Sequence, residues 1–183
     1  MHLPIEKTWD GLAVGPDERA EVRVGRAGRD WTIEVHAPFH DDPPPPQAAG
    51  SCPGLWTYEV VECFLVAENR HYLEVELGPH GHYLLLSLEG ARNIVRRGMP
   101  ASYRAEIDRR GRRWHGSITI DGDLVPLPVT HVNAFALHGL APLRRHLCFW
   151  PLGGGRPDFH RIERYPSFMA PTVAAAGAAA PGD

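Results

Sequence analysis

The sequence predicts an all-β fold, an antiparallel β-sandwich of about nine strands, from three observations. Short segments that alternate apolar and polar residues recur along the chain. Clusters of glycine, proline and aspartate separate these segments and mark turns. No long window shows the apolar period of an amphipathic helix. Short strands with frequent turns are typical of two packed sheets.

The expected strands follow one another closely. In order they are Glu21–Val24, Asp30–Ala37, Tyr58–Val66, His71–Leu77, His82–Leu88, Ser102–Asp108, Trp114–Ile120, Asn133–His138 and His146–Trp150. Tyr58–Val66 is nearly continuous in apolar residues, which indicates a strand covered on both faces. His71–Leu77 alternates strictly, so Tyr72, Glu74 and Glu76 share one face of their strand.

The chain is long enough for one domain with a substantial core. We expect a single β-sandwich domain over residues 1–168 and a flexible tail of alanine, glycine and proline over residues 169–183. Pro38–Gly54 is too long for a simple connection and contains the run Pro43–Pro46. Such a loop either edges a binding site or acts as a rigid spacer.

Charge and composition narrow the class of partner. A net charge of −3 and a pI near 6.4 provide no field that attracts nucleic acid or an anionic membrane. Lys7 is the only lysine, and alanine, glycine and proline are abundant, which indicates a GC-rich coding bias. We therefore expect a bacterial source. The arginine-rich segment Arg109–Arg113 is interpreted as a solvated hairpin loop.

The cellular location is inferred from what the chain lacks and from its thiols. The first ten residues are too polar for a signal peptide, and no apolar run is long enough to span a membrane. The three cysteines, Cys52, Cys63 and Cys148, lack metal-ligand spacing and are expected to be reduced thiols. Cys63 lies inside a strand, where it is expected to pack as a small apolar side chain. These features predict a cytoplasmic protein.

Several stretches resemble the landmarks of one protein family, in unbroken order from Ile5 to Phe168. They are IEKTWDG at Ile5–Gly11, APFHDDPPPP at Ala37–Pro46, LWTYEVVECFL at Leu55–Leu65, YLEVELGPHGHYL at Tyr72–Leu84, FALHG at Phe135–Gly139 and PDFHRIERYPSF at Pro157–Phe168. The chain is similar to the family named after the chromosome-four open-reading-frame-thirty-three protein. That resemblance implies a jelly-roll type sandwich like the family-9 carbohydrate-binding modules and the DOMON-like domains.

The broader carbohydrate-module group suggests where a ligand would lie. Its sugar-binding members have a V-E-x-F-like strand followed by a strand that leads into a P-x-G turn, which Val61–Phe64 and Gly78–Gly81 resemble. Those members hold a terminal saccharide between aromatic rings and bind its hydroxyls with polar side chains. By this resemblance Trp56 and Trp150, each at the end of an expected strand, are the candidate rings.

Glu62, within an otherwise apolar strand, is the residue that most needs an explanation. A buried carboxylate must be hydrogen-bonded, paired, protonated or open to a cleft. Glu62 therefore either pairs with an arginine or tyrosine in the core or lines a ligand cleft. Glu74 and Glu76 either face solvent or, if Glu62 lies beside them, complete a set of three carboxylates. Sugar hydroxyls, Ca²⁺ or an arginine would relieve their repulsion.

Histidines provide the remaining candidate site residues. His80 and His82 flank Gly81 in a turn, and they could bind Zn²⁺ together with His36, His138 or His160. The alternative is that they make hydrogen bonds within the loop. Asp158-Phe159-His160 is expected to form a turn in which Asp158 caps backbone amides and Phe159 anchors the loop, or else to contact ligand.

The sequence predicts a binding protein for a small polar ligand, for which a saccharide is the leading candidate. The candidate ligand-binding residues are Trp56, Glu62, Glu74, Glu76, His80, His82, Trp150 and His160. The alternative is a hydrolase of a sugar-like substrate with Glu62 and His80 or His82 as acid and base. A third hypothesis makes Pro43–Pro46 a segment recognised by a protein partner. No cofactor is expected, and the sequence leaves any metal and the oligomeric state open.

Overall fold

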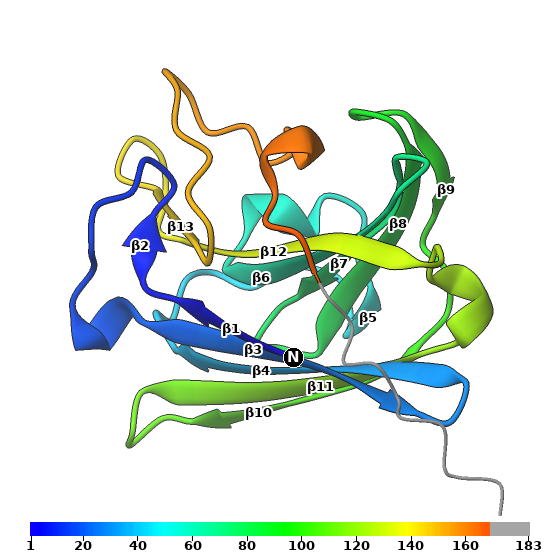
Figure 1. The fold of residues 1–183 in the computed structure, drawn as a ribbon. Coiled ribbons are helices and arrows are strands. Elements are labelled where there is room, and N and C mark those ends of the chain that lie inside the picture. Colours follow the sequence, from blue (N-terminus) through cyan, green and yellow to red (C-terminus); the bar gives the residue numbers. More distant parts are fainter. Residues whose placement is uncertain (169–183) are drawn as a thin grey trace, which may run out of the picture.

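The computed structural model describes residues 1–168 and contains two stacked β-sheets (Figure 1). The predicted tail, residues 169–183, lies outside the described residues. The predicted all-β sandwich is confirmed, because strands dominate the described chain and its helices are four single 3₁₀ turns. These turns are η1 (Pro16–Glu18), η2 (Leu55–Thr57), η3 (Gly122–Leu124) and η4 (Ile162–Arg164). None of these helices is long or apolar enough to cross a membrane.

The first sheet has five strands in the order β1-β3-β4-β11-β10, and all neighbours are antiparallel. Its strands are β1 (His2–Ile5), β3 (Ala20–Ala27), β4 (Asp30–Pro38), β10 (Ser102–Asp108) and β11 (Arg113–Ile120). The hairpin between β10 and β11 contains the exposed arginines of residues 109–112, as predicted for a solvated loop.

The second sheet has the order β2-β13-β12-β6-β7-β8-β5, with β9 paired to β8. Its strands are β2 (Lys7–Thr8), β5 (Gly50–Ser51), β6 (Val60–Ala67), β7 (His71–Leu77), β8 (His82–Glu89), β9 (Ile94–Arg97), β12 (Val129–His138) and β13 (Arg145–Cys148). Among the strands of residues 1–168, only the β5–β8 pair is parallel. Every expected strand is present, and the structure adds the short strands β1, β2, β5 and β9.

Alternate residues of both sheets fill the space between them. Ile33 and Val35 of β4 face Val61 and Leu65 of β6 in one buried apolar cluster. Cys63 belongs to the same cluster, so its expected packing as a small apolar side chain is confirmed. Burial raises the pKa of the Cys63 thiol to about 12, which keeps it protonated and unreactive.

The outer face of the eight-stranded sheet is also covered. In Figure 1 the chain that follows β13 lies above this face, on the side away from the five-stranded sheet. Its side chains Leu152, Ile162 and Tyr165 join Phe64 and Phe135 in a second buried cluster. The prediction that both faces of Tyr58–Val66 are covered is therefore confirmed. The same covering removes the face of β7 that carries Glu74 and Glu76 from solvent.

Candidate functional site

A cavity of about 520 Å³ lies on this covered outer face. Its floor comes from the neighbouring strands β6, β7 and β8. Its walls come from η2, the β8–β9 turn, the start of β13 and residues 157–160. The lining residues are Trp56, Thr57, Glu62, Glu74, Leu86, Leu88, Arg92, Ile94, Leu137, Arg144, His146, Pro157, Asp158, Phe159 and His160. Segments far apart in the chain thus meet over one part of the sheet.

Strand register places three carboxyl groups together at the floor. Glu62 on β6 lies directly opposite Glu76 on β7, and Glu74 is two residues from Glu76 on the same face. All three side chains are buried, and Glu76 has no measurable exposure. Directly opposed like charges destabilise a sheet, so this arrangement needs protonation or a counter-charge.

None of the three carboxyl groups forms an ion pair within residues 1–168. One oxygen of Glu74 and both oxygens of Glu76 are buried without a hydrogen-bond partner among the described residues. Each group loses hydration without gaining a partner, and the neutral acid is then the favoured form.

The pKa values follow from this burial. Burial, together with the charge of Glu74, raises the pKa of Glu62 well above its usual range. Burial raises the pKa of Glu74 to about 8, and Arg92 offsets a smaller part. Burial and the charges of Glu62 and Glu74 raise the pKa of Glu76 to about 10. The Trp56 amide opposes this rise slightly, although it does not reach hydrogen-bond geometry with Glu76.

Arg144 shapes one wall of the cavity through the backbone. Its guanidinium donates to the carbonyl oxygens of Trp56, Thr57 and Tyr58 at 2.8, 3.2 and 2.7 Å, and to that of Gly139 at 3.0 Å. These bonds tie η2 to the turn between β12 and β13. Arg144 acts on Glu62 as a neighbouring charge, which lowers the pKa of that carboxyl group by less than burial raises it.

Another wall of the cavity is built around Asp158. This carboxylate accepts hydrogen bonds from the backbone amide of His160 at 3.1 Å and from Arg92 at 2.8 Å. The predicted capping turn at Asp158 is therefore present. Phe159 stacks on Phe135 with ring centroids 3.9 Å apart, so it anchors the loop as predicted and also lines the cavity. The Nδ1 atom of His160 lies 2.8 Å from the Tyr72 hydroxyl.

The structure brings together only some of the candidate residues chosen from the sequence. Trp56, Glu62, Glu74 and His160 line the cavity. Glu76 lies on the same sheet face but outside the lining. Trp150, about half exposed at 47 %, is also outside the lining.

His80 and His82 lie elsewhere, around a separate space of about 10 Å³ beside Pro43–Pro45. His82 Nε2 is 2.9 Å from the carbonyl oxygen of Gln47, a hydrogen bond within the loop. Glu62 therefore shares no cavity with His80 or His82, and the hydrolase alternative has no such acid–base pair here. Within the described chain, no group of three or more His, Cys, Asp or Glu side chains is placed to hold a metal ion.

Sequence reasoning missed several residues of the cavity. Arg92, Arg144 and His146 line it from turns or from the start of a short strand, where no alternation indicates a direction. The sequence indicated only that a buried Glu62 needs a partner such as an arginine, and it did not indicate which arginine. The structure shows that the bonds of Arg144 go to carbonyl groups instead.

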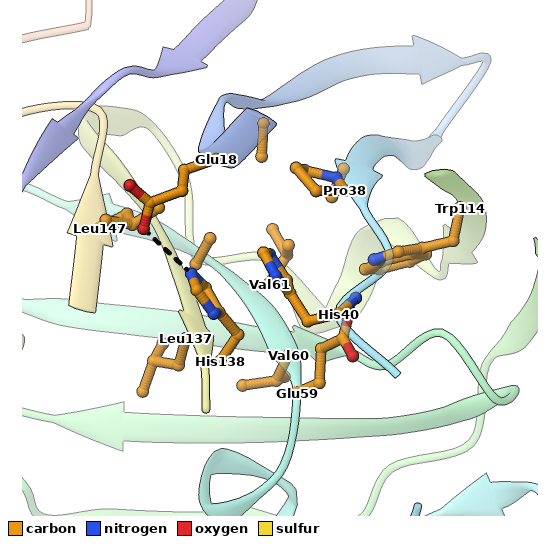
Figure 2. Close-up of a pocket in the computed structure, with 13 residues that line it drawn as sticks. Glu18, Pro38, His40, Glu59, Val60, Val61, Trp114, Leu137, His138 and Leu147 are labelled. Atoms are coloured by element: carbon orange, nitrogen blue, oxygen red, sulfur yellow. Dashed lines mark hydrogen bonds and ion pairs between the residues drawn. The ribbon is translucent and has the colours of Figure 1, made fainter. Parts of the chain in front are cut away.

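A second polar cluster joins the two sheets at one end of the sandwich (Figure 2). The rings of His40 and His138 stack in parallel with centroids 3.5 Å apart, and His138 Nε2 lies 3.5 Å from Glu18. Glu59 accepts the backbone amides of His40 and Asp42 at 3.0 and 3.3 Å. Burial, together with the charge of His138, lowers the pKa of His40 to about 4, so both stacked rings stay neutral near pH 7. This cluster connects the end of β4 to the end of β12.

Comparison with known proteins identifies relatives of this chain by sequence and by fold. No family model matches the chain. The chain is 38 % identical to the mouse UPF0462 protein C4orf33 homolog, covering 94 % of this chain and 93 % of that protein. It is 37 % identical to human UPF0462 protein C4orf33 and 34 % identical to the zebrafish homolog, covering 94 % of this chain and 90 % and 91 % of those proteins. These vertebrate relatives conflict with the expected bacterial source.

A solved structure from Bacteroides uniformis, whose name proposes that it binds carbohydrate, has the same fold. It has a TM-score of 0.65 and 17 % identity, and the match covers 92 % of this chain and 86 % of that one. The resemblance to DOMON-like domains stays a prediction. The sequence landmarks, the sandwich and the relatives agree: the chain belongs to the UPF0462 family of C4orf33 proteins.

Proposed function

We propose that this protein binds a small polar ligand, with a saccharide as the leading class, in the cavity over β6, β7 and β8. The observation that carries the proposal is a cavity of about 520 Å³ with polar groups at its floor and aromatic rings at its walls. Small-molecule sites have volumes of about 300–1,000 Å³ and combine apolar walls with a few convergent polar groups.

The walls and the floor have different roles in this proposal. Trp56 is 45 % exposed, and Phe159 is fixed by its stack on Phe135, so both offer ring surface to the apolar face of a sugar. Glu62 and Glu74, as neutral acids, can both donate and accept hydrogen bonds with hydroxyl groups. The Bacteroides neighbour, named for proposed carbohydrate binding, supports the class of ligand through fold alone.

Isothermal titration calorimetry against a panel of monosaccharides and oligosaccharides tests the proposal. We expect at least one sugar to bind and Trp56→Ala to weaken that binding about tenfold, the loss of one stacking ring. Trp150→Ala is the matched control, because Trp150 is equally exposed but lies outside the cavity.

Absence of binding across the panel would refute the proposed function. An equal loss of affinity in Trp56→Ala and Trp150→Ala would refute the assignment of the cavity. Glu62→Gln keeps the shape of the floor and is expected to alter the affinity of the same sugar.

A further inference from the structure

Three carboxyl groups lie at the floor of the cavity without a basic partner in the described chain. Glu62, Glu74 and Glu76 come from adjacent strands, are at most 4 % exposed, and have no ion-pair partner within residues 1–168. The nearest guanidinium groups are engaged elsewhere, Arg144 with backbone carbonyl groups and Arg92 with Asp158. In the part of the chain that the structure describes, the cavity therefore has several buried acids and no basic side chain that forms an ion pair with them.

The carboxyl oxygens without hydrogen-bond partners indicate where a donor group on a ligand would contribute most to binding. Glu74 lines the cavity, and its Oε2 atom is buried without a hydrogen-bond partner in the described chain. Glu62 lines the same cavity and lies across from Glu76, whose two oxygens are also unpartnered. A donor that entered the cavity beside Glu62 and Glu74 would meet two carboxyl groups that form no ion pair within residues 1–168.

We propose that the cavity selects ligands that carry a protonated primary amine, such as amino sugars, over neutral ligands of the same shape. This inference rests on the proposed function and specifies its ligand class. An ammonium group offers three hydrogen-bond donors and one positive charge, which suit the two carboxyl groups of Glu62 and Glu74 in the cavity lining. A bare divalent cation fits less well, because no three such side chains within residues 1–168 are arranged to coordinate one.

Binding of an ammonium group would be coupled to proton release. The raised pKa values mean that these acids are protonated in the free protein, and a cation favours their ionised form. The other ionisable groups around them are Arg92, Arg144, His146, Asp158 and His160 at the walls, with Tyr72, Glu76 and Tyr165 beside the floor. Burial lowers the pKa of His146 and brings that of His160 to about 4, so these rings stay neutral as the acids lose a proton.

Calorimetry with D-glucosamine, D-glucose and N-acetyl-D-glucosamine tests this inference, because the three differ only at one ring position. We expect glucosamine to bind at least about tenfold more tightly than either neutral sugar. Titration in phosphate and in HEPES should show release of about one proton per glucosamine bound. Affinity should rise about tenfold between about pH 5.5 and about pH 6.5, where the ligand amine stays protonated.

Variants locate the effect. Glu74→Gln should abolish most of the preference and the proton release, because it should weaken binding of glucosamine far more than binding of the two neutral sugars. Glu106→Gln, an exposed glutamate on β10 of the other sheet, is the matched control and should behave as the wild type. Circular dichroism of each variant confirms that it is folded.

The outcomes separate the two proposals. Equal affinity for glucosamine and glucose, without proton release, would refute the amine preference and leave the saccharide site standing. If none of the three sugars and no member of the wider panel binds, the proposed function itself is refuted. A preference that persists in Glu74→Gln and Glu62→Gln would refute these carboxylates as its source.

Discussion

The unpaired carboxyl group of Glu76 should make the folded protein less stable as the pH rises, and Glu76→Gln should remove this effect. Glu76 is fully buried and opposite Glu62, and its pKa rises from 4.5 to about 10 on folding. A group whose folded pKa lies above its unfolded value stabilises fully below the unfolded value. That contribution is lost as the pH rises toward the folded value.

The expected size follows from proton linkage. Between about pH 5.5 and about pH 7.5 the folded state keeps the Glu76 proton while the unfolded state has lost it. Each pH unit then lowers the free energy of unfolding by about 1.4 kcal/mol, or about 3 kcal/mol over the interval. Glutamine keeps the side-chain shape and does not titrate, so the variant should lose this slope.

Urea denaturation at several pH values, followed by circular dichroism, measures this. The difference in the free energy of unfolding between Glu76→Gln and the wild type should grow in favour of the variant as the pH rises. Glu106→Gln, which is exposed, should parallel the wild type. Parallel pH profiles for the wild type and Glu76→Gln would refute the account of Glu76 as a buried, unpaired acid.

Three further substitutions, one of them with a matched control, probe other parts of the structure. Arg144→Gln should destabilise the protein by about 2–3 kcal/mol in urea denaturation, because it removes the hydrogen bonds that the guanidinium donates to four backbone carbonyl oxygens. Arg145→Gln, at an exposed ion pair with Glu18, should cost below about 1 kcal/mol, and equal losses would contradict the role of Arg144. The wild type should lose stability as the pH falls from about 6.5 to about 4, because the His40 ring is held neutral in the folded state. His40→Gln should reduce this loss by about 1 kcal/mol after allowing for partial solvent exposure. An unchanged loss of stability over this pH range would count against the neutral histidine stack. Phe64→Ala should cost about 3–5 kcal/mol by differential scanning calorimetry, because Phe64 is fully buried against Phe135 and Tyr165, and a loss near zero would show that the outer cluster is loosely packed.

Alternation and turn residues were sufficient to predict the long strands. Alternation did not predict β2 and β5, because a strand of two residues is too short to show an apolar–polar alternation. It did not predict β1 either, because Pro4 interrupts the pattern there. Pro4 is tolerated because β1 is an edge strand, paired only with β3. These short strands form because a neighbouring strand offers free hydrogen-bonding groups, which local sequence does not show.

The candidate site was predictable in its floor and not in its walls. The alternation of β7 places Glu74 and Glu76 on one face, but local sequence does not show whether that face meets water. The segment after β13 covers that face, and this segment has no apolar periodicity and lies far from β7 in the sequence. Trp56 and Trp150 have the same local signals and similar exposure, and only the tertiary arrangement places one in the cavity and the other outside it.

The covering of the eight-stranded sheet has a consequence for synthesis on the ribosome. All strands of both sheets precede residue 149, whereas Leu152, Ile162 and Tyr165, which cover Phe64 and Phe135, come last in the described chain. A nascent chain that stops before these residues can pair its strands but leaves aromatic and leucine side chains of β6, β8 and β12 in water. Such a truncated chain presents a large apolar surface to chaperones and to other copies of itself. The final twenty described residues therefore complete the burial of this apolar surface.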